Sequence, residues 1–136
     1  MTWGVRRSGF IEMRGKLDQL KGAARDDVLR EAFTAGGEPV ANAARDLVRV
    51  SSGRLRDSIG VGTGRSPRQA ALNGAHKGVQ VYVGPGALPE AITEEFGTLH
   101  EEPHPFLRPA WDSQQGAAID EIARVVSTEV DRIAKD

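Results

Sequence analysis

Apolar residues in the first part of the chain recur at three- and four-residue steps, which is the spacing of an amphipathic helix. Residues 10–20 and residues 25–34 both follow this pattern. Gly22 lies between the two stretches, and glycine disfavours a helix because it loses more backbone freedom on folding than any other residue. The pattern therefore predicts two helices with a break near Gly22.

Glycine and proline divide the helical part further. The pair Gly36-Gly37 is expected to interrupt the second helix, because glycine is unfavourable inside helices. Pro39 is then expected to restart a helix, because the first turn of a helix tolerates proline. The alanines that follow are small enough to let this helix lie close to another surface. Residues 1–50 are therefore predicted to be helical, in separate pieces.

Strand signals fill the middle of the chain, residues 51–98. Residues 54–61 predict a first strand, and residues 79–83, which alternate Val, Gln, Val, Tyr and Val, predict a second. Residues 60–78 are rich in glycine and basic residues, contain no acidic residue, and predict a long hairpin loop. Residues 91–98 predict either a third strand or a helical turn that leads into a strand.

Prolines stiffen the connector that follows, residues 99–108. Pro103 and Pro105 fix the backbone φ angle and disfavour helical geometry in the residues before them. Pro109 then opens the last predicted helix, residues 109–136, whose apolar side chains recur on one face. A connector with this stiffness is suited to aim a helix, whereas a flexible link needs no such prolines.

This order of elements predicts an α+β fold in a single domain of 136 residues. We expect a small antiparallel sheet of three to four strands, with N-terminal helices and a long C-terminal helix packed on it. The edges of such a sheet expose unpaired backbone groups, which can pair with another chain. The predicted fold is thus suited to self-assembly.

Three motifs occur in the order expected for one family. They are residues 52–59 (Ser-Gly-Arg-Leu-Arg-Asp-Ser-Ile), residues 79–85 (Val-Gln-Val-Tyr-Val-Gly-Pro), and Phe-Gly-Thr at 96–98 followed by Pro-Phe-Leu-Arg-Pro-Ala at 105–110. Together they resemble the tail-completion, or tail-component, proteins of long-tailed bacteriophages. One departure is that residues 91–93 are Ala-Ile-Thr, where the family often has an aromatic residue.

The resemblance implies a structural virion protein that is not an enzyme. Such a protein would form a ring, a hexamer matching the tail tube, in the neck at the head–tail junction, where it joins or completes the tail. Its partners would be its own copies and adjacent proteins such as head-closure, tail-terminator or tail-tube proteins, with packaged DNA in the channel. It would assemble in the host cytoplasm, where an isolated subunit is expected to be monomeric.

Side chains around the connector are candidates for contacts between subunits, because a buried aromatic anchor contributes strongly to an interface. The alternative is that Phe106, Leu107 and Trp111 cap the core of their own chain. The interface candidates are Phe96, Pro105, Phe106, Leu107, Arg108 and Trp111.

Charge is balanced over the whole chain, with 18 basic and 19 acidic residues, so no global attraction to nucleic acid or to a membrane is expected. Basic residues nevertheless gather in and before the predicted loop. We expect them to contact packaged DNA or a neighbouring ring. The alternatives are a solvated loop, or a small nucleic-acid-binding or regulatory domain that uses this loop. The residues are Arg54, Arg56, Arg65, Arg68 and Lys77.

Other chemistry finds little support in the sequence. The chain has no cysteine, which excludes disulfides and thiolate metal sites. Residues 60–66 lack the glycine spacing and the lysine of a phosphate-binding loop. His100 and His104 have a spacing that suits metal binding on a helix, but Pro103 disfavours a helix there. We therefore expect no cofactor, no catalysis and no membrane span, with an unrecognised carboxylate pair as the remaining enzyme alternative.

Overall fold

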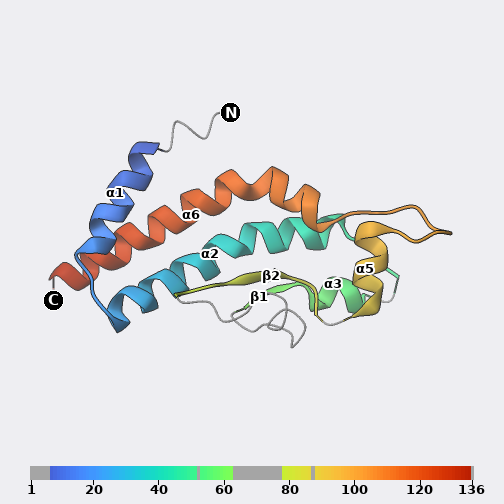
Figure 1. Cartoon of the computed structure of the whole chain (residues 1–136), viewed down its shortest axis with the longest axis horizontal. Helices are drawn as coiled ribbons and strands as arrows, with labels where there is room; N and C mark the ends of the chain where they lie inside the picture. The colour runs from blue at the N-terminus through green and yellow to red at the C-terminus, as the bar shows by residue number, and fades with distance from the viewer. Residues whose placement is uncertain (1–6, 52, 63–77, 87, 136) are drawn as a thin grey trace.

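The computed structural model describes residues 7–51, 53–62, 78–86 and 88–135, and it arranges them in layers (Figure 1). The two longest helices, α2 and α6, run side by side in opposite directions. A small sheet lies along α2, α1 packs at one end of α6, and α3 and α5 lie at the other end. The elements are α1 (Arg7–Asp18), α2 (Ala23–Leu47), α3 (Arg54–Ser58), β1 (Gly60–Gly62), β2 (Tyr82–Gly84), α5 (Pro89–Phe96) and α6 (Leu107–Lys135).

The core consists of two apolar clusters, one toward each end of the α2–α6 pair. One cluster joins α1 to the first half of α2 and the second half of α6. The other joins the second half of α2 to α3, α5 and the start of α6, and its largest side chain, Phe106, is fully buried. The predicted α+β class is confirmed in outline, because the chain is mostly helical with a small antiparallel sheet and a long C-terminal helix.

Helix α2 is uninterrupted, so the prediction that Gly36-Gly37 divides it was wrong. Pro39 also lies inside this helix and does not start a new one. Its ring nitrogen cannot donate the helical hydrogen bond to the carbonyl of Ala35, which is a local cost. Packing on two sides of the helix offsets that cost, and the glycine pair makes this packing possible.

Each glycine of the pair lets a different layer approach α2. A Cβ atom at Gly36 would lie 2.5 Å from Cγ1 of Ile122 and 2.9 Å from the carbonyl oxygen of Ala118, both on α6. A Cβ atom at Gly37 would lie 2.9 Å from Cγ1 of Val61 on β1 and from Cγ2 of Val83 on β2. Consecutive residues point about 100° apart around a helix. The pair therefore opens one side of α2 to helix α6 and another side to the sheet.

Within the described residues the sheet has two strands, not the three to four predicted. Strands β1 and β2 are antiparallel, with Val61 opposite Val83. Residues 54–58, predicted as part of a strand, form helix α3, and helix α5 occupies most of the predicted third strand, 91–98. The C-terminal helix α6 packs on α2, while the sheet covers another face of α2.

The short helix α3 connects the sheet to α2. Gly53, with a φ of 84° in the left-handed region that favours glycine, turns the chain into α3. Arg45 on α2 donates two hydrogen bonds to the carbonyl of the buried Ile59, from Nε at 3.0 Å and from Nη2 at 2.7 Å. The hydroxyl of Ser58 accepts a hydrogen bond from the backbone N–H of Gly86 at 3.1 Å. These contacts fix the start of β1 relative to α2 and the end of β2.

We expect Gly36→Ala to lower the free energy of unfolding by roughly 1–3 kcal/mol, because its Cβ would overpack the α2–α6 contact. Gly15→Ala is a matched control, since a Cβ at this helical glycine of α1 meets nothing within 4 Å. The control should raise stability by about 0.5–1 kcal/mol. Urea denaturation measures both changes, and equal effects of the two substitutions would contradict this packing.

Candidate interaction surface

The segment between α5 and α6 projects from the end of the molecule (Figure 1). We call residues 97–105 the arm. Its tip is closed by Thr98, whose N–H donates to the carbonyl of Glu101 at 2.9 Å and whose hydroxyl accepts the N–H groups of His100 and Glu101 at 3.2 and 3.0 Å. Its base is fixed by the N–H of His104, which donates to the carbonyl of Glu94 at 2.7 Å. The arm is therefore an ordered projection held at both ends.

Gly97 makes the turn from α5 into the arm. Its φ is 74°, in the region that favours glycine, and a Cβ there would lie 2.8 Å from the carbonyl oxygen of Glu101 and from the nitrogen of Pro103. Both atoms belong to the backbone, so they cannot move aside cheaply. The Phe-Gly-Thr motif thus has a physical explanation, in which glycine allows the turn and threonine closes the tip.

Glu95 connects α5 to the start of α6. Its Oε1 accepts the backbone N–H groups of Phe106 at 3.0 Å and Leu107 at 2.9 Å, and its Oε2 accepts that of Arg108 at 3.3 Å. These are N–H groups for which a helix start offers no carbonyl partner. A carboxylate is also favoured at the positive end of the helix dipole. One side chain therefore holds both sides of the arm together.

The cap also explains why α6 begins at Leu107 and not at the predicted Pro109. Pro109 has no N–H, and it occupies a position in the first turn where none is needed. The next residue, Ala110, already donates to the carbonyl of Phe106 at 3.3 Å. Every N–H group at this helix start is thus paired or absent. Sequence reasoning missed Glu95 because its partners lie 11 to 13 residues away.

The interface candidates from the sequence divide into two groups. Phe106 is 0% exposed in the chain's own core, and Leu107 packs beside that core. Phe106 therefore takes the alternative role of a core side chain that anchors the arm. Phe96 is 75% exposed and Trp111 is 48% exposed, so both remain available to a partner. Pro105 and Arg108 are also exposed.

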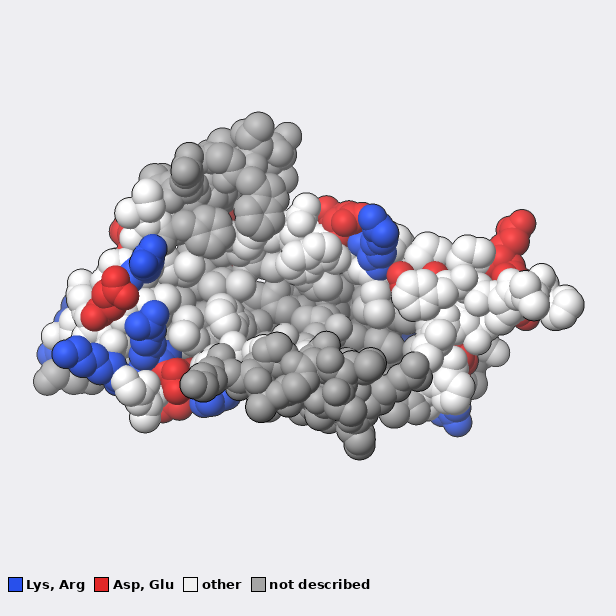
Figure 2. Space-filling model, viewed as in Figure 1, with Lys and Arg blue, Asp and Glu red and all other residues white. Residues whose placement is uncertain are grey.

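Large exposed apolar side chains in the described residues gather at the end that carries the arm. Leu99, near the arm tip, is fully exposed, and Ile92 lies one helical turn before Phe96 on α5. In Figure 2 this end, on the right, is mostly uncharged surface, with acidic and basic side chains at its rim. One exposed apolar side chain of this kind, Ile11 on α1, lies instead at the opposite end of the molecule. The set at the arm end is Leu47, Val50, Ile92, Phe96, Leu99 and Trp111.

A half-enclosed groove of about 250 Å³ lies between α5 and the segment that joins α2 to α3. Arg49 and Glu94 face each other across it, with Nε and Nη2 of Arg49 donating to the two carboxylate oxygens at 3.0 and 2.6 Å. These bonds lower the pKa of Glu94 below its ordinary value. The lining residues are Arg49, Ser51, Gly53, Leu55, Arg56, Glu90 and Glu94.

The candidate basic residues are placed only in part. Arg54 donates to Glu90 on α5 at 2.8 Å, and Arg56 donates to its neighbour Asp57 at 3.1 Å. The pKa of Glu90 is lowered first by a hydrogen bond from its own backbone N–H and then by the bond from Arg54. The remaining candidates, Arg65, Arg68 and Lys77, and most of the predicted loop lie outside the described residues.

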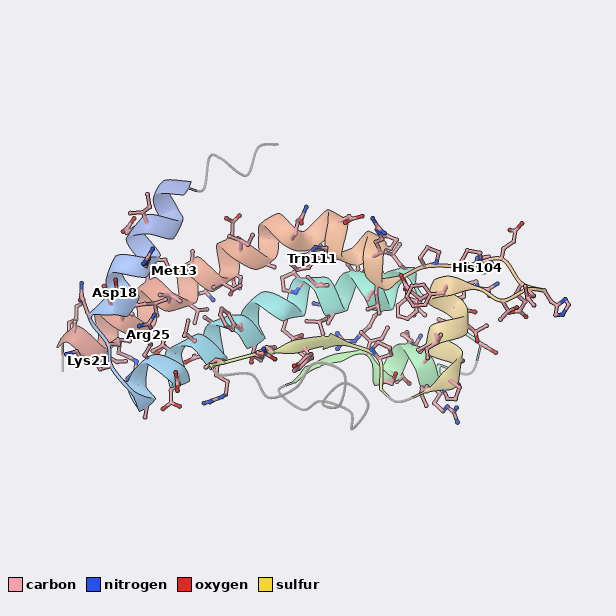
Figure 3. All side chains as sticks on the ribbon, viewed as in Figure 1. Met13, Asp18, Lys21, Arg25, His104 and Trp111 are labelled. Atoms are coloured by element: carbon pink, nitrogen blue, oxygen red, sulfur yellow. The ribbon has the colours of Figure 1, made fainter. Side chains whose placement is uncertain are left out.

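His100 and His104 both lie in the arm (His104 is labelled in Figure 3), and both are exposed. Across the described residues, no group of three or more histidine, aspartate or glutamate side chains is placed to hold a metal ion. No helix in the described part of the chain is long and apolar enough to span a bilayer.

The model of the HK97-gp10-like family, described as a bacteriophage HK97-gp10 tail component, matches residues 11–97. The chain belongs to this family of phage tail components. Searches of curated proteins and of solved structures found no match. Membership indicates a structural component of the phage tail, located in the virion.

The match runs from within α1 to the end of α5, and it does not include α6. It ends at Gly97, where the arm begins, and it includes Glu95. The resemblance predicted from residues 52–59, 79–85 and 96–98 is confirmed at the level of the family. The segment 105–110 lies beyond the matched residues, and the structure explains it as the capped start of α6.

We expect Glu95→Ala to lower the free energy of unfolding of this tail component by roughly 0.5–2 kcal/mol, the usual cost of losing a helix cap. Glu95→Gln should cost less, because its side chain keeps one oxygen that accepts hydrogen bonds. The backbone N–H groups of Phe106 and Leu107 should exchange with solvent faster in the alanine variant, as measured by NMR. Unchanged stability and exchange in that variant would disprove the cap.

The lowered pKa of Glu94 predicts a pH-dependent contribution to stability. The bonds to Arg49 stabilise the fold above the unfolded-state pKa of about 4.3, and this stabilisation is lost as the pH falls through the lower folded-state pKa. Wild type should therefore unfold at a higher temperature than Glu94→Gln at pH 7, and the difference should shrink below about pH 4. Glu12→Gln, on the exposed side of α1, controls for loss of one carboxylate. A difference that is constant with pH would contradict the prediction.

Proposed function

We propose that this tail component forms a ring in the neck of the virion, at the head–tail junction, where it completes the tail. Copies of the chain contact one another through the arm end. The observation that carries the proposal is Leu99, which is fully exposed on a projection braced by Glu95. In an isolated subunit the charged side chains of the arm are well hydrated. The exposed side chains of Leu99 and Phe96, in contrast, gain free energy when they are buried against a partner.

The rigidity of the arm supports an assembly role. Ordering a flexible loop on binding costs free energy, whereas an arm already fixed by hydrogen bonds avoids most of that cost. Burying one leucine or phenylalanine side chain contributes about 1.5–3 kcal/mol. This is too little for a stable dimer by itself, but the same contact repeated around a ring acts cooperatively. The proposal therefore includes a monomeric subunit that assembles only on its partner ring in the host cytoplasm.

The proposed ring is a hexamer, and its neighbours in the neck are head-closure, tail-terminator or tail-tube proteins. Packaged DNA would pass through its channel. A nucleic-acid-binding domain is less well supported, because the chain as a whole is balanced in charge, with 18 basic and 19 acidic residues.

The double substitution Phe96→Ser with Leu99→Ser should abolish tail completion without unfolding the subunit, because both side chains are exposed. We expect at least a tenfold loss of infectious particles when the variant complements a phage that lacks the gene. Circular dichroism should show an unchanged fold, and electron microscopy should show tails that are not joined to heads.

The matched control is Ile11→Ser, which removes an apolar side chain that is 69% exposed at the opposite end of the molecule. This variant should support a normal yield of infectious particles. A normal yield from the double variant, or an equal loss from the control, would argue against assembly through the arm.

A further inference from the structure

The arm tip has a distinctive chemical character. Leu99 is fully exposed at the turn, and the exposed side chains of Glu101 and Glu102 follow it. The arm, residues 97–105, contains no lysine or arginine. Its tip therefore presents one apolar side chain beside two negative charges, and it fits a surface that combines an apolar floor with a basic rim.

The groove beside α5 offers some apolar surface and two exposed guanidinium groups. Gly53 and the buried Leu55 contribute apolar surface to its lining. In the pair between Arg49 and Glu94, the guanidinium side chain is 54% exposed and the carboxylate side chain only 17%. The positive partner thus faces solvent while the negative partner is covered. Arg56, which is bonded to Asp57, adds a second exposed guanidinium, and the lining also includes the exposed carboxylate of Glu90, which is bonded to Arg54.

The arm of the same chain is held away from this groove. Its base is fixed by the bond from His104 to the carbonyl of Glu94, and the arm extends from the end of α5 away from the body of the molecule (Figures 1 and 3). An occupant with the character of the arm tip must therefore come from another molecule. A nucleic acid is a poorer occupant, since its phosphates offer no apolar group to Leu55.

We propose that the arm tip of one copy seats in the groove of the next copy in the ring. Leu99 lies on the floor formed by Gly53 and Leu55, and Glu101 and Glu102 approach Arg49 and Arg56. This inference rests on the proposed ring and specifies its contact. Because arm and groove are different surfaces, the contact is head-to-tail, and contacts of this kind close into rings when the rotation between copies allows it.

Cysteine crosslinking tests the contact directly, because the chain contains no cysteine of its own. The variant with Leu99→Cys and Ser51→Cys places one thiol on the tip and one in the groove lining. Assembled tails are treated with a short bis-maleimide and separated on a denaturing gel. We expect a ladder of covalent oligomers up to the ring size, because each copy links to the next.

Two control variants define the result. Leu99→Cys alone should give no species larger than a dimer, and Leu99→Cys with Ile11→Cys should give no ladder, because Ile11 lies at the other end of the molecule. Assembled rings without a ladder, or with equal ladders from both double variants, would overturn the arm-in-groove contact while leaving the ring intact. The absence of any ring of wild-type chains in the neck would instead overturn the proposed function.

A charge exchange decides the matter if the cysteine variants do not assemble. Glu101→Arg with Glu102→Arg should reduce the yield of infectious particles at least tenfold, because like charges then meet at the groove. Adding Arg56→Glu should restore part of that yield. Normal assembly of the reversed tip, or a lack of any restoration, would count against the proposed contact.

Discussion

The carboxylate of Glu95 is the contact on which the arm end of the molecule depends. It accepts three backbone N–H groups at the start of α6, and so joins the end of one helix to the beginning of the next. The intervening arm is then fixed in direction at both ends. Without this cap, those N–H groups would lose their partners. The arm would then lose conformational entropy whenever it bound another molecule, which would weaken binding.

A second constraint sets the shape of the framework that carries the arm. The glycine pair of α2 places helix α6 against one side of that helix and the sheet against another. Helices α2 and α6 are consequently closely packed, and Phe106 anchors the arm in the apolar cluster at one end of this pair. The buried Phe106 therefore anchors the arm in the core, while Phe96 at the end of α5 and Leu99 on the arm remain exposed.

Local patterns predicted the parts of the fold that local forces determine. The helices near residues 10–20 and 109–136 and the break at Gly22 were predicted correctly, because each depends on apolar spacing or on a positive φ angle. Residues 54–61 were assigned to a strand because alternation alone does not reveal the turn at Gly53. The continuity of α2 at Gly36-Gly37 depends on packing against α6 and the sheet. These neighbours are distant in sequence, so the residues around the glycine pair do not reveal them.

The site was predicted in the same uneven way. The connector and its aromatic residues were identified, but the exposed Leu99 and the capping Glu95 were not, because exposure and long-range hydrogen bonds follow from the packed structure.

The most direct test of assembly through the arm is a cryo-electron microscopy reconstruction of the virion neck. We predict a ring in which each arm keeps its hydrogen-bonded conformation and Leu99 is buried against the next copy. A ring whose arm tips lie in solvent, or a neck without this chain, would contradict it.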